Sequence, residues 1–194
     1  MKTGNRLAIM WVVAVVGIFG AGFTAWAAGD VLIENGGFEY ADQSWSLWGD
    51  GDVKQEYYGV KAQEGGSFVR LWKRSGWYQD FPTRKDSRYS VTAFVNTAGK
   101  DVMKGDAYGE VKVEWRNKTE GDVAVGEPVS VKFDVVGKAD TAITPDTWTE
   151  ITLPEVKAPE KATHCRVLVT VWCTDEKGGG CALFDGISVK PLLP

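Results

Sequence analysis

The sequence predicts an all-β protein, a two-sheet β-sandwich of jelly-roll type. Three observations lead to this fold class. Short segments alternate between apolar and polar residues with a period of two, which is typical of half-buried strands. Clusters of glycine, asparagine, aspartate and proline separate these segments, and the chain holds 23 glycines. No stretch with helical periodicity is longer than about two turns. An up-and-down barrel is the alternative for strands at this spacing.

The expected strands run from residue 31 almost to the end of the chain. The clearest is the segment from His164 to Cys173, in which Cys165, Val167 and Val169 share one face. In the segment 88–96 the odd positions carry the apolar residues and are expected to face the core. The expected strands are Val31–Ile33, Ser67–Lys73, Gly76–Phe81, Arg88–Asn96, Glu110–Asn117, Val129–Val136, Thr147–Leu153, His164–Cys173 and Ala182–Lys190.

Residues 1–27 have the pattern of a secretory signal peptide. Lys2 and Arg6 precede an apolar run from Leu7 to Phe23, and Ala25-Trp26-Ala27 matches a cleavage site between small residues. An uncleaved anchor helix is the alternative, because the apolar run is near the minimum length for spanning a bilayer. Residues 28–194 then form one domain, expected to be secreted to the cell surface, the extracellular medium or the periplasm.

The charge of the chain disfavours nucleic acid as a partner. The formal net charge is −4, and no stripe of lysine and arginine appears in the sequence. Proteins that bind nucleic acid hold its phosphates with clustered basic residues. A membrane partner is expected only if the signal segment remains uncleaved.

Three cysteines in an exported chain allow one disulfide bond. Cys173 and Cys181 flank a segment rich in turn residues, which could return one strand beside the next. The sequence therefore predicts a disulfide between Cys173 and Cys181, with Cys165 buried as a thiol.

Several motifs, in their order along the chain, resemble the carbohydrate-binding modules of families 4, 9 and 22. They are Leu32–Glu39, Trp45–Gly49, Ala62–Gly66, Gly76–Phe81 and the closing Leu183–Val189. The resemblance covers nearly all of residues 28–194. It implies a galactose-binding-like β-sandwich that binds polysaccharide chains in a groove, is usually attached to a glycoside hydrolase and often carries a structural calcium ion.

Candidate ligand-binding residues follow from the chemistry of sugars. A sugar presents apolar C–H faces and a ring of hydroxyl groups, so its site needs flat aromatic rings beside polar side chains. Such residues fall on strand faces opposite to the aliphatic rows. The candidates are Trp72, Tyr78, Phe94, Glu114, Arg116, Arg166 and Trp172. The alternative is that these rings pack in the core, as tryptophan commonly does; Trp45 and Trp77 are expected to be core residues.

The resemblance also implies which residues would hold calcium. It places Glu39, Glu64 and Asp185 at the metal site, and carboxylates are ligands that Ca²⁺ prefers. The alternative is that these acids pair with surface lysine or arginine.

Catalysis is not expected. His164 is the one histidine, and no serine or cysteine motif accompanies it. The cysteines lack the paired spacing of a zinc site. A glycoside hydrolase, which needs only two carboxylates, is the less favoured reading. The main alternative to polysaccharide binding is a cell-surface or matrix protein that uses the sandwich for structural or adhesive protein contacts.

Overall fold

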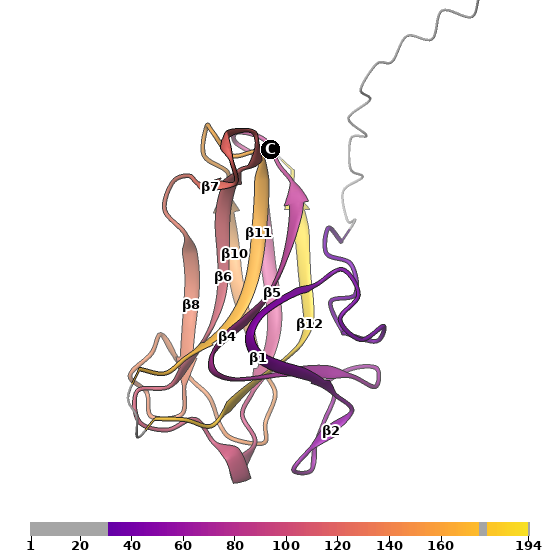
Figure 1. The fold of residues 1–194 in the computed structure, drawn as a ribbon, viewed down its shortest axis with the longest axis vertical. Coiled ribbons are helices and arrows are strands. Elements are labelled where there is room, and N and C mark those ends of the chain that lie inside the picture. Colours follow the sequence, from indigo (N-terminus) through magenta and orange to yellow (C-terminus); the bar gives the residue numbers. More distant parts are fainter. Residues whose placement is uncertain (1–30, 175–177, 194) are drawn as a thin grey trace, which may run out of the picture.

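The computed structural model describes residues 31–174 and 178–193, and nearly all of its regular structure is β-strand (Figure 1). Two 3-10 turns accompany the strands. In chain order the elements are β1 (Ser46–Lys54), β2 (Glu56–Tyr57), β3 (Val60–Lys61), β4 (Phe68–Pro82), β5 (Arg88–Asn96), η1 (Gly99–Asp101), β6 (Tyr108–Asn117), η2 (Lys118–Glu120), β7 (Val123–Ala124), β8 (Val129–Asp134), β9 (Thr141–Ala142), β10 (Thr149–Lys157), β11 (His164–Trp172) and β12 (Cys181–Leu192). The predicted signal peptide, residues 1–27, lies outside the described residues.

The long strand β4 organises the sheet, because three other strands pair with it. Nearly the whole of β1 pairs with β4, from Ser46 opposite Tyr78 to Lys54 opposite Phe68. On the other edge of β4, β12 pairs with the first half and β11 pairs with the second half. The sheet therefore divides at the middle of β4. One branch has the order β4-β12-β5-β10, and the other has the order β4-β11-β6-β8-β9.

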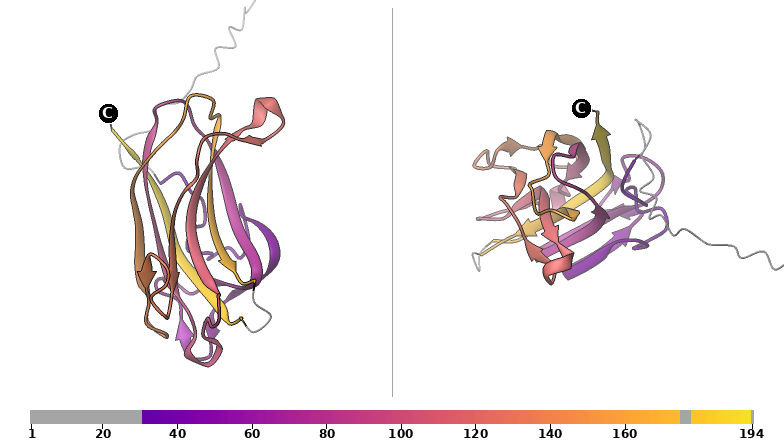
Figure 2. Two further views of the ribbon diagram at one scale, coloured as in Figure 1. Left: turned by 90° about the vertical axis from the view of Figure 1, so that its left-hand side faces the viewer. Right: turned by 90° about the horizontal axis from the view of Figure 1, so that it is seen from above.

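The two branches face each other and enclose one hydrophobic core. Phe133 of β8 contacts Phe184 of β12, with ring centroids 5.7 Å apart. The ring centroids of Tyr89 of β5 and Trp115 of β6 are 6.5 Å apart. In the long strands β5, β6, β10 and β11, alternate residues point inward, so each of these strands places one row in the core and one row outside. Most of the long strands, among them β5, β6, β11 and β12, run along the longest axis of the molecule, whereas β1 lies across it (Figure 1 and the left view of Figure 2). The predicted sandwich is thus one hydrogen-bonded sheet that curls into two layers.

A second, smaller cluster lies on the outer side of the β4-β12 layer. Phe68 and Leu183 are fully buried there, and the β2–β3 hairpin and Trp148 cover them. Trp148 is fixed by a hydrogen bond from its Nε1 to the carbonyl oxygen of Lys61, 2.8 Å long. This outer surface is therefore largely occupied by the protein's own side chains.

The longer expected strands from residue 88 onward agree with the structure, whereas the short strands β2, β3, β7 and β9 were not predicted. The two strands expected at 67–73 and 76–81 are one bent strand, β4, and the sequence reading missed β1. The segment 31–33 is not a strand, although the backbone N–H of Leu32 donates to the carbonyl of Val189.

Within the described ranges, none of the helical segments has the length and apolar character needed to cross a membrane.

Candidate functional site

The branch β4-β11-β6-β8-β9 forms one layer of the sandwich. The outer face of this layer gathers most of the polar and aromatic side chains that point away from the core. We call it the charged face. Cross-strand register places Arg166 of β11 between Asp80 of β4 and Glu114 of β6, and places Leu168 between Tyr78 and Lys112. Loop residues after β6 fold against the same strands. The charged face consists of Trp48, Arg74, Tyr78, Asp80, Tyr108, Glu110, Lys112, Glu114, Arg116, Lys118, Asp122, Lys132, Arg166, Thr170 and Trp172.

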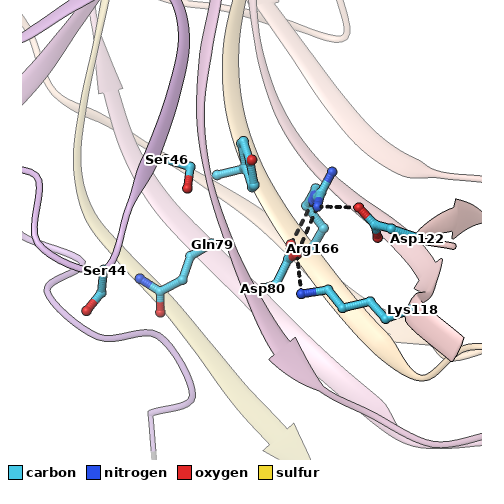
Figure 3. Close-up of a pocket in the computed structure, with 8 residues that line it drawn as sticks. Ser44, Ser46, Gln79, Asp80, Lys118, Asp122 and Arg166 are labelled. Carbon is cyan, nitrogen blue, oxygen red and sulfur yellow. Dashed lines mark hydrogen bonds and ion pairs between the residues drawn. The ribbon is translucent and has the colours of Figure 1, made fainter.

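A two-pronged ion pair lies at the centre of the charged face (Figure 3). Nε and Nη2 of Arg166 donate to the two carboxylate oxygens of Asp80 at 2.7 and 2.8 Å. Nζ of Lys118 reaches the same carboxylate at 2.9 Å. Burial alone would raise the pKa of Asp80, but the hydrogen bonds from Arg166 and Lys118 lower it below its ordinary value. The hydrogen bonds to Asp80 likewise raise the pKa of Arg166, so both groups are charged at neutral pH.

Asp122 extends this network from a loop. Gly121 and Asp122, which follow η2, both have positive φ, and this turn carries the Asp122 carboxylate back over the sheet. Asp122 accepts from Nε of Arg116 at 3.1 Å and pairs with Arg166 at 3.3 Å. Hydrogen bonding from Arg116 lowers the pKa of the Asp122 carboxyl. Arg116 also lies 3.8 Å from Glu114, which pairs with Lys112 at 2.8 Å. The network therefore fixes the loop against β6 and β11.

Four half-buried aromatic rings accompany the charges. Trp48 and Trp172 lie with their ring centroids 5.5 Å apart, and Nε1 of Trp172 donates to Oγ1 of Thr170 at 3.0 Å. Trp48 rests on the backbone of Gly76, where a Cβ atom would lie 2.7 Å from Nε1 of Trp48. The other two rings are Tyr78 and Tyr108. Such half-exposed rings can stack against an apolar sugar face.

A cleft with a volume of about 410 Å³ opens beside the ion pair. It lies where β1 begins, so that the edge of β4 at Gln79 and Asp80 has no strand beside it. Ser44, Ser46 and Gln79 lie on one side of the cleft in Figure 3, and Lys118, Asp122 and Arg166 lie on the other. The cleft thus offers hydroxyl, amide, carboxylate and guanidinium groups to a polar ligand.

The structure brings together five of the seven candidate ligand-binding residues. Tyr78, Glu114, Arg116, Arg166 and Trp172 all lie on the charged face. The expectation of one common groove is wrong for Trp72 and Phe94. Trp72 packs against the second cluster and contacts the guanidinium group of Arg70. Phe94 lies on β5, in the opposite layer, beside Asp185. Side-chain parity along a strand does not reveal which layer the strand joins, and this caused the error.

Other residues of the site were missed by the sequence reading. Asp80 shares the parity of Tyr78 on β4, so the alternation alone could have identified it. Trp48 belongs to the unrecognised strand β1. Asp122 and Lys118 reach the face from the loop after β6, and no local sequence signal indicates this approach. Trp45 and Trp77 are buried, as expected.

The three predicted calcium ligands lie at a separate corner of the molecule. A Cβ atom on Gly37 would lie 3.7 Å from Oδ1 of Asp185 and 3.9 Å from Oε1 of Glu39, and one on Gly186 would lie 3.4 Å from Oε1 of Glu64. Asp185 is fully buried and accepts from the backbone N–H groups of Gln63 and Gly186 at 2.8 and 2.7 Å.

The acidic corner matches calcium in ligand type but not in arrangement. Burial, with a further contribution from the charge of Glu64, raises the pKa of Asp185 to about 6, and a nearby cation would relieve both effects. Glu39, however, is turned toward the N–H groups of Gly66 and Ser67. Among the described residues, no group of three acidic, histidine or cysteine side chains is arranged to hold a metal ion. A bound calcium ion would require Glu39 and the exposed Glu64 to turn inward.

The structure corrects the expected disulfide between Cys173 and Cys181. All three cysteines are thiols. Cys173 continues the inward row of β11, packs against the main core and contacts Asp106. Cys181 begins β12 in the outward row and is buried in the second cluster. The two side chains point to opposite faces of the sheet, and thiols that diverge in this way cannot bond without moving the backbone. Cys165 is buried, as expected, and burial raises its pKa well above the ordinary value.

Comparisons with known proteins identify the fold. No protein-family model and no curated protein matches the sequence. Solved structures do match. The chain is similar to the xylan-binding CBM22-1 domain of Paenibacillus barcinonensis Xyn10C, with 18% identity and a TM-score of 0.57 over 88% of this chain and 99% of that one. It is also similar to a family 61 carbohydrate-binding module in complex with β-1,4-galactotriose, with 17% identity and a TM-score of 0.55 over 84% of this chain and 99% of that one.

A third similar structure is the enzymatically active domain of tailspike protein 4 from bacteriophage CBA120. It has 9% identity and a TM-score of 0.59, and the match covers 84% of this chain but only 21% of the tailspike chain. At these identities the likenesses establish the fold alone. They confirm the jelly-roll β-sandwich that the resemblance to carbohydrate-binding modules implied.

Proposed function

We propose that the protein binds a polysaccharide on the charged face and does not transform it chemically. The observation that carries this proposal is the combination of half-buried rings and fixed polar groups on one side of the sandwich. Trp48, Trp172 and Tyr78 supply stacking surfaces, and the Asp80–Arg166 pair borders a cleft of about 410 Å³. The structural neighbours with the same fold include modules whose names record xylan and β-1,4-galactotriose as ligands, which supports a carbohydrate partner.

The arrangement of charges favours binding over hydrolysis. In the usual two-carboxylate glycosidase mechanisms one carboxyl group must deliver a proton, and its pKa is raised for that role. On the charged face the pKa values of Asp80 and Asp122 are lowered by their arginine partners. These groups are therefore suited to accepting hydrogen bonds from sugar hydroxyls, and the proposal assigns them no catalytic step.

The main alternative, an adhesive or structural protein, would be favoured by a contiguous exposed apolar patch. The large apolar side chains that are exposed in the described residues, such as Tyr40, Tyr58, Val123 and Val136, come from separate segments of the chain. The charged face is polar and hollowed at the cleft, which fits a hydroxyl-rich ligand better than an apolar partner. We further propose, from the pattern of residues 1–27, that the protein is exported to where such glycans occur.

A binding assay with two matched aromatic variants tests the proposal. The parent protein, incubated with a panel of soluble and insoluble polysaccharides, should bind at least one of them. Trp172→Ala should weaken that binding by about 1 to 3 kcal/mol, the usual effect of removing an aromatic anchor. Tyr58→Ala is the control, because Tyr58 is 55% exposed and lies on the turn between β2 and β3, away from the charged face. Absence of binding to every glycan, or equal losses in both variants, would refute the proposal.

A further inference from the structure

Three of the aromatic rings on the charged face have a cation above them. The guanidinium carbon of Arg166 lies 4.3 Å from the centroid of Tyr78. The guanidinium carbon of Arg74 lies 4.8 Å from the centroid of Trp172, and Nζ of Lys132 lies 4.9 Å from the centroid of Tyr108. A neutral sugar that stacks on these rings must share or displace these cations, and it offers them no charge in return.

The charged face also differs in sign from the chain as a whole. It holds six cations and four acids, a balance of +2, whereas the formal net charge of the chain is −4. The cations are Arg74, Lys112, Arg116, Lys118, Lys132 and Arg166, and the acids are Asp80, Glu110, Glu114 and Asp122. Positive charge is therefore concentrated on the side that carries the rings.

Two of these six cations lack an acidic partner within the described part of the chain. Arg166, Arg116, Lys118 and Lys112 share the carboxylates of Asp80, Asp122 and Glu114. The fourth acid, Glu110, is buried and accepts from Thr170. Across residues 31–174 and 178–193, no ion pair engages Arg74 or Lys132, and both are exposed. The guanidinium group of Arg74 and the ammonium group of Lys132 each lie over the face of an aromatic ring, and the backbone N–H of Lys132 donates to Asp140 at 2.8 Å.

From this arrangement we infer that the ligand of the charged face is an acidic polysaccharide, one whose sugar rings carry carboxylate groups. This inference rests on the proposed function and specifies its substrate class. A sugar ring stacked at the edge of Trp172 or Tyr108 places a uronate carboxylate within reach of Arg74 or Lys132. A charge-assisted hydrogen bond is stronger than an exposed cation–π contact, so the cation gains by leaving the ring face for the carboxylate. The planar guanidinium group of Arg74 also matches a carboxylate in two-pronged geometry.

Polygalacturonate and its fully methyl-esterified form provide a matched pair of probes, because they share a backbone and differ in the charge of the carboxyl group. Affinity electrophoresis or calorimetry at two salt concentrations should show that the parent binds polygalacturonate about tenfold more tightly than the ester. Xylan and β-1,4-galactan complete the panel as neutral glycans. The preference for polygalacturonate should weaken at high salt.

Charge variants connect the preference to the two residues. Arg74→Gln and Lys132→Gln should each reduce affinity for polygalacturonate about fivefold and remove most of its advantage over xylan and β-1,4-galactan, because a neutral sugar offers the cation no charge. Lys85→Gln is the control, because Lys85 is an exposed lysine outside the charged face that pairs with Glu160 at 3.2 Å. Equal losses in Lys85→Gln and the two test variants would indicate general charge attraction and would overturn the inference.

The outcomes separate this inference from the proposed function. Binding to neutral glycans with no preference for polygalacturonate would overturn the acidic substrate class and leave polysaccharide binding intact. Absence of binding to all four probes and to a wider glycan panel would overturn both. A preference for polygalacturonate that depends on Arg74 and Lys132 would support both.

Discussion

The Asp80–Arg166 pair shows how single residues make the charged face rigid. The side chains of Asp80 and Arg166 are only 12% and 15% exposed, so each charge needs its partner. Two parallel hydrogen bonds fix the guanidinium plane, and Tyr78 lies against that plane. A ligand therefore meets a preformed polar surface and does not have to order it.

Asp80→Asn should destabilise the protein by about 2 kcal/mol at neutral pH, because it removes the main counter-charge of the Arg166 guanidinium group and leaves only the more exposed Asp122 at 3.3 Å. The pKa of Asp80 is lower in the folded protein than in the unfolded chain, where it is near 4. Its stabilising contribution is complete above that ordinary value and is lost as the pH falls through the lowered pKa.

Urea unfolding of the parent and Asp80→Asn proteins at a series of pH values measures this difference. The gap between the two proteins should narrow progressively below about pH 4. Asp86→Asn serves as the control, because Asp86 is an exposed partner of Lys157 and its removal should change stability little. A gap that does not depend on pH would contradict the assigned role of the Asp80 charge.

At the scale of elements, β4 carries the division of the sheet and a close contact that shapes the site. Gly76 lies just after the point where β12 ends its pairing with β4 and β11 begins. The ring of Trp48 from β1 and the methyl group of Thr170 from β11 both lie against Gly76. Only a residue without a side chain allows these three strands to approach so closely.

Gly76→Ala should displace Trp48, since the added Cβ atom would lie 2.7 Å from Nε1 of Trp48 and 2.8 Å from Cγ2 of Thr170. We expect a loss of about 1 to 3 kcal/mol in the free energy of unfolding, together with weaker glycan binding. Gly66→Ala is the comparison, because its Cβ atom would lie 3.5 Å from the nearest side chain, an ordinary contact. Thermal melting and tryptophan fluorescence would follow the two variants, and an unshifted spectrum for Gly76→Ala would argue against the proposed contact.

The divergent positions of Cys173 and Cys181 also lead to a prediction. Because Cys173, just after β11, continues the inward row of that strand and Cys181 begins β12 in the outward row, no disulfide joins the two cysteines. A reducing agent should therefore leave the melting temperature of the purified protein unchanged, and titration under denaturing conditions should detect three thiols. A melting temperature that falls by several degrees under reduction would restore the disulfide assignment.

These elements also show what the sequence could reveal. The alternation of β5 and β11 identified both the strands and their inward rows, because a half-buried strand must place apolar residues at every second position. The same alternation placed Tyr78, Arg166 and Trp172 on outward rows. It could not separate Trp72 from Trp172, because pairing between distant strands decides which layer each row joins. β1 was missed because its sequence is rich in glycine and aspartate, which disfavour strands. Its hydrogen-bonded pairing with β4 holds it in strand conformation despite this weak local preference.

For the whole molecule, the acidic corner connects segments that are far apart in sequence. Asp185 of β12 accepts from the backbone of Gln63, and Glu39 accepts from Gly66 and Ser67. The N-terminal segment, the loop before β4 and the last strand thus meet at one place. An ion bound there would join the two ends of the domain.

If Glu39 and Glu64 turn inward and a calcium ion binds, the ion should stabilise the fold without taking part in glycan binding, because Asp185 lies on β12 and the charged face is built on β4, β6 and β11. An ion that binds only the native state raises stability as RT ln(1 + [Ca²⁺]/Kd), about 2.7 kcal/mol at one hundred times Kd. EDTA should lower the melting temperature and excess calcium should restore it, whereas magnesium should not, because it demands a stricter octahedral arrangement. In Asp185→Asn this response should disappear, and in Asp86→Asn it should persist. A melting temperature that is the same with EDTA and with excess calcium would show that the hydrogen bonds from the backbone alone hold the corner together.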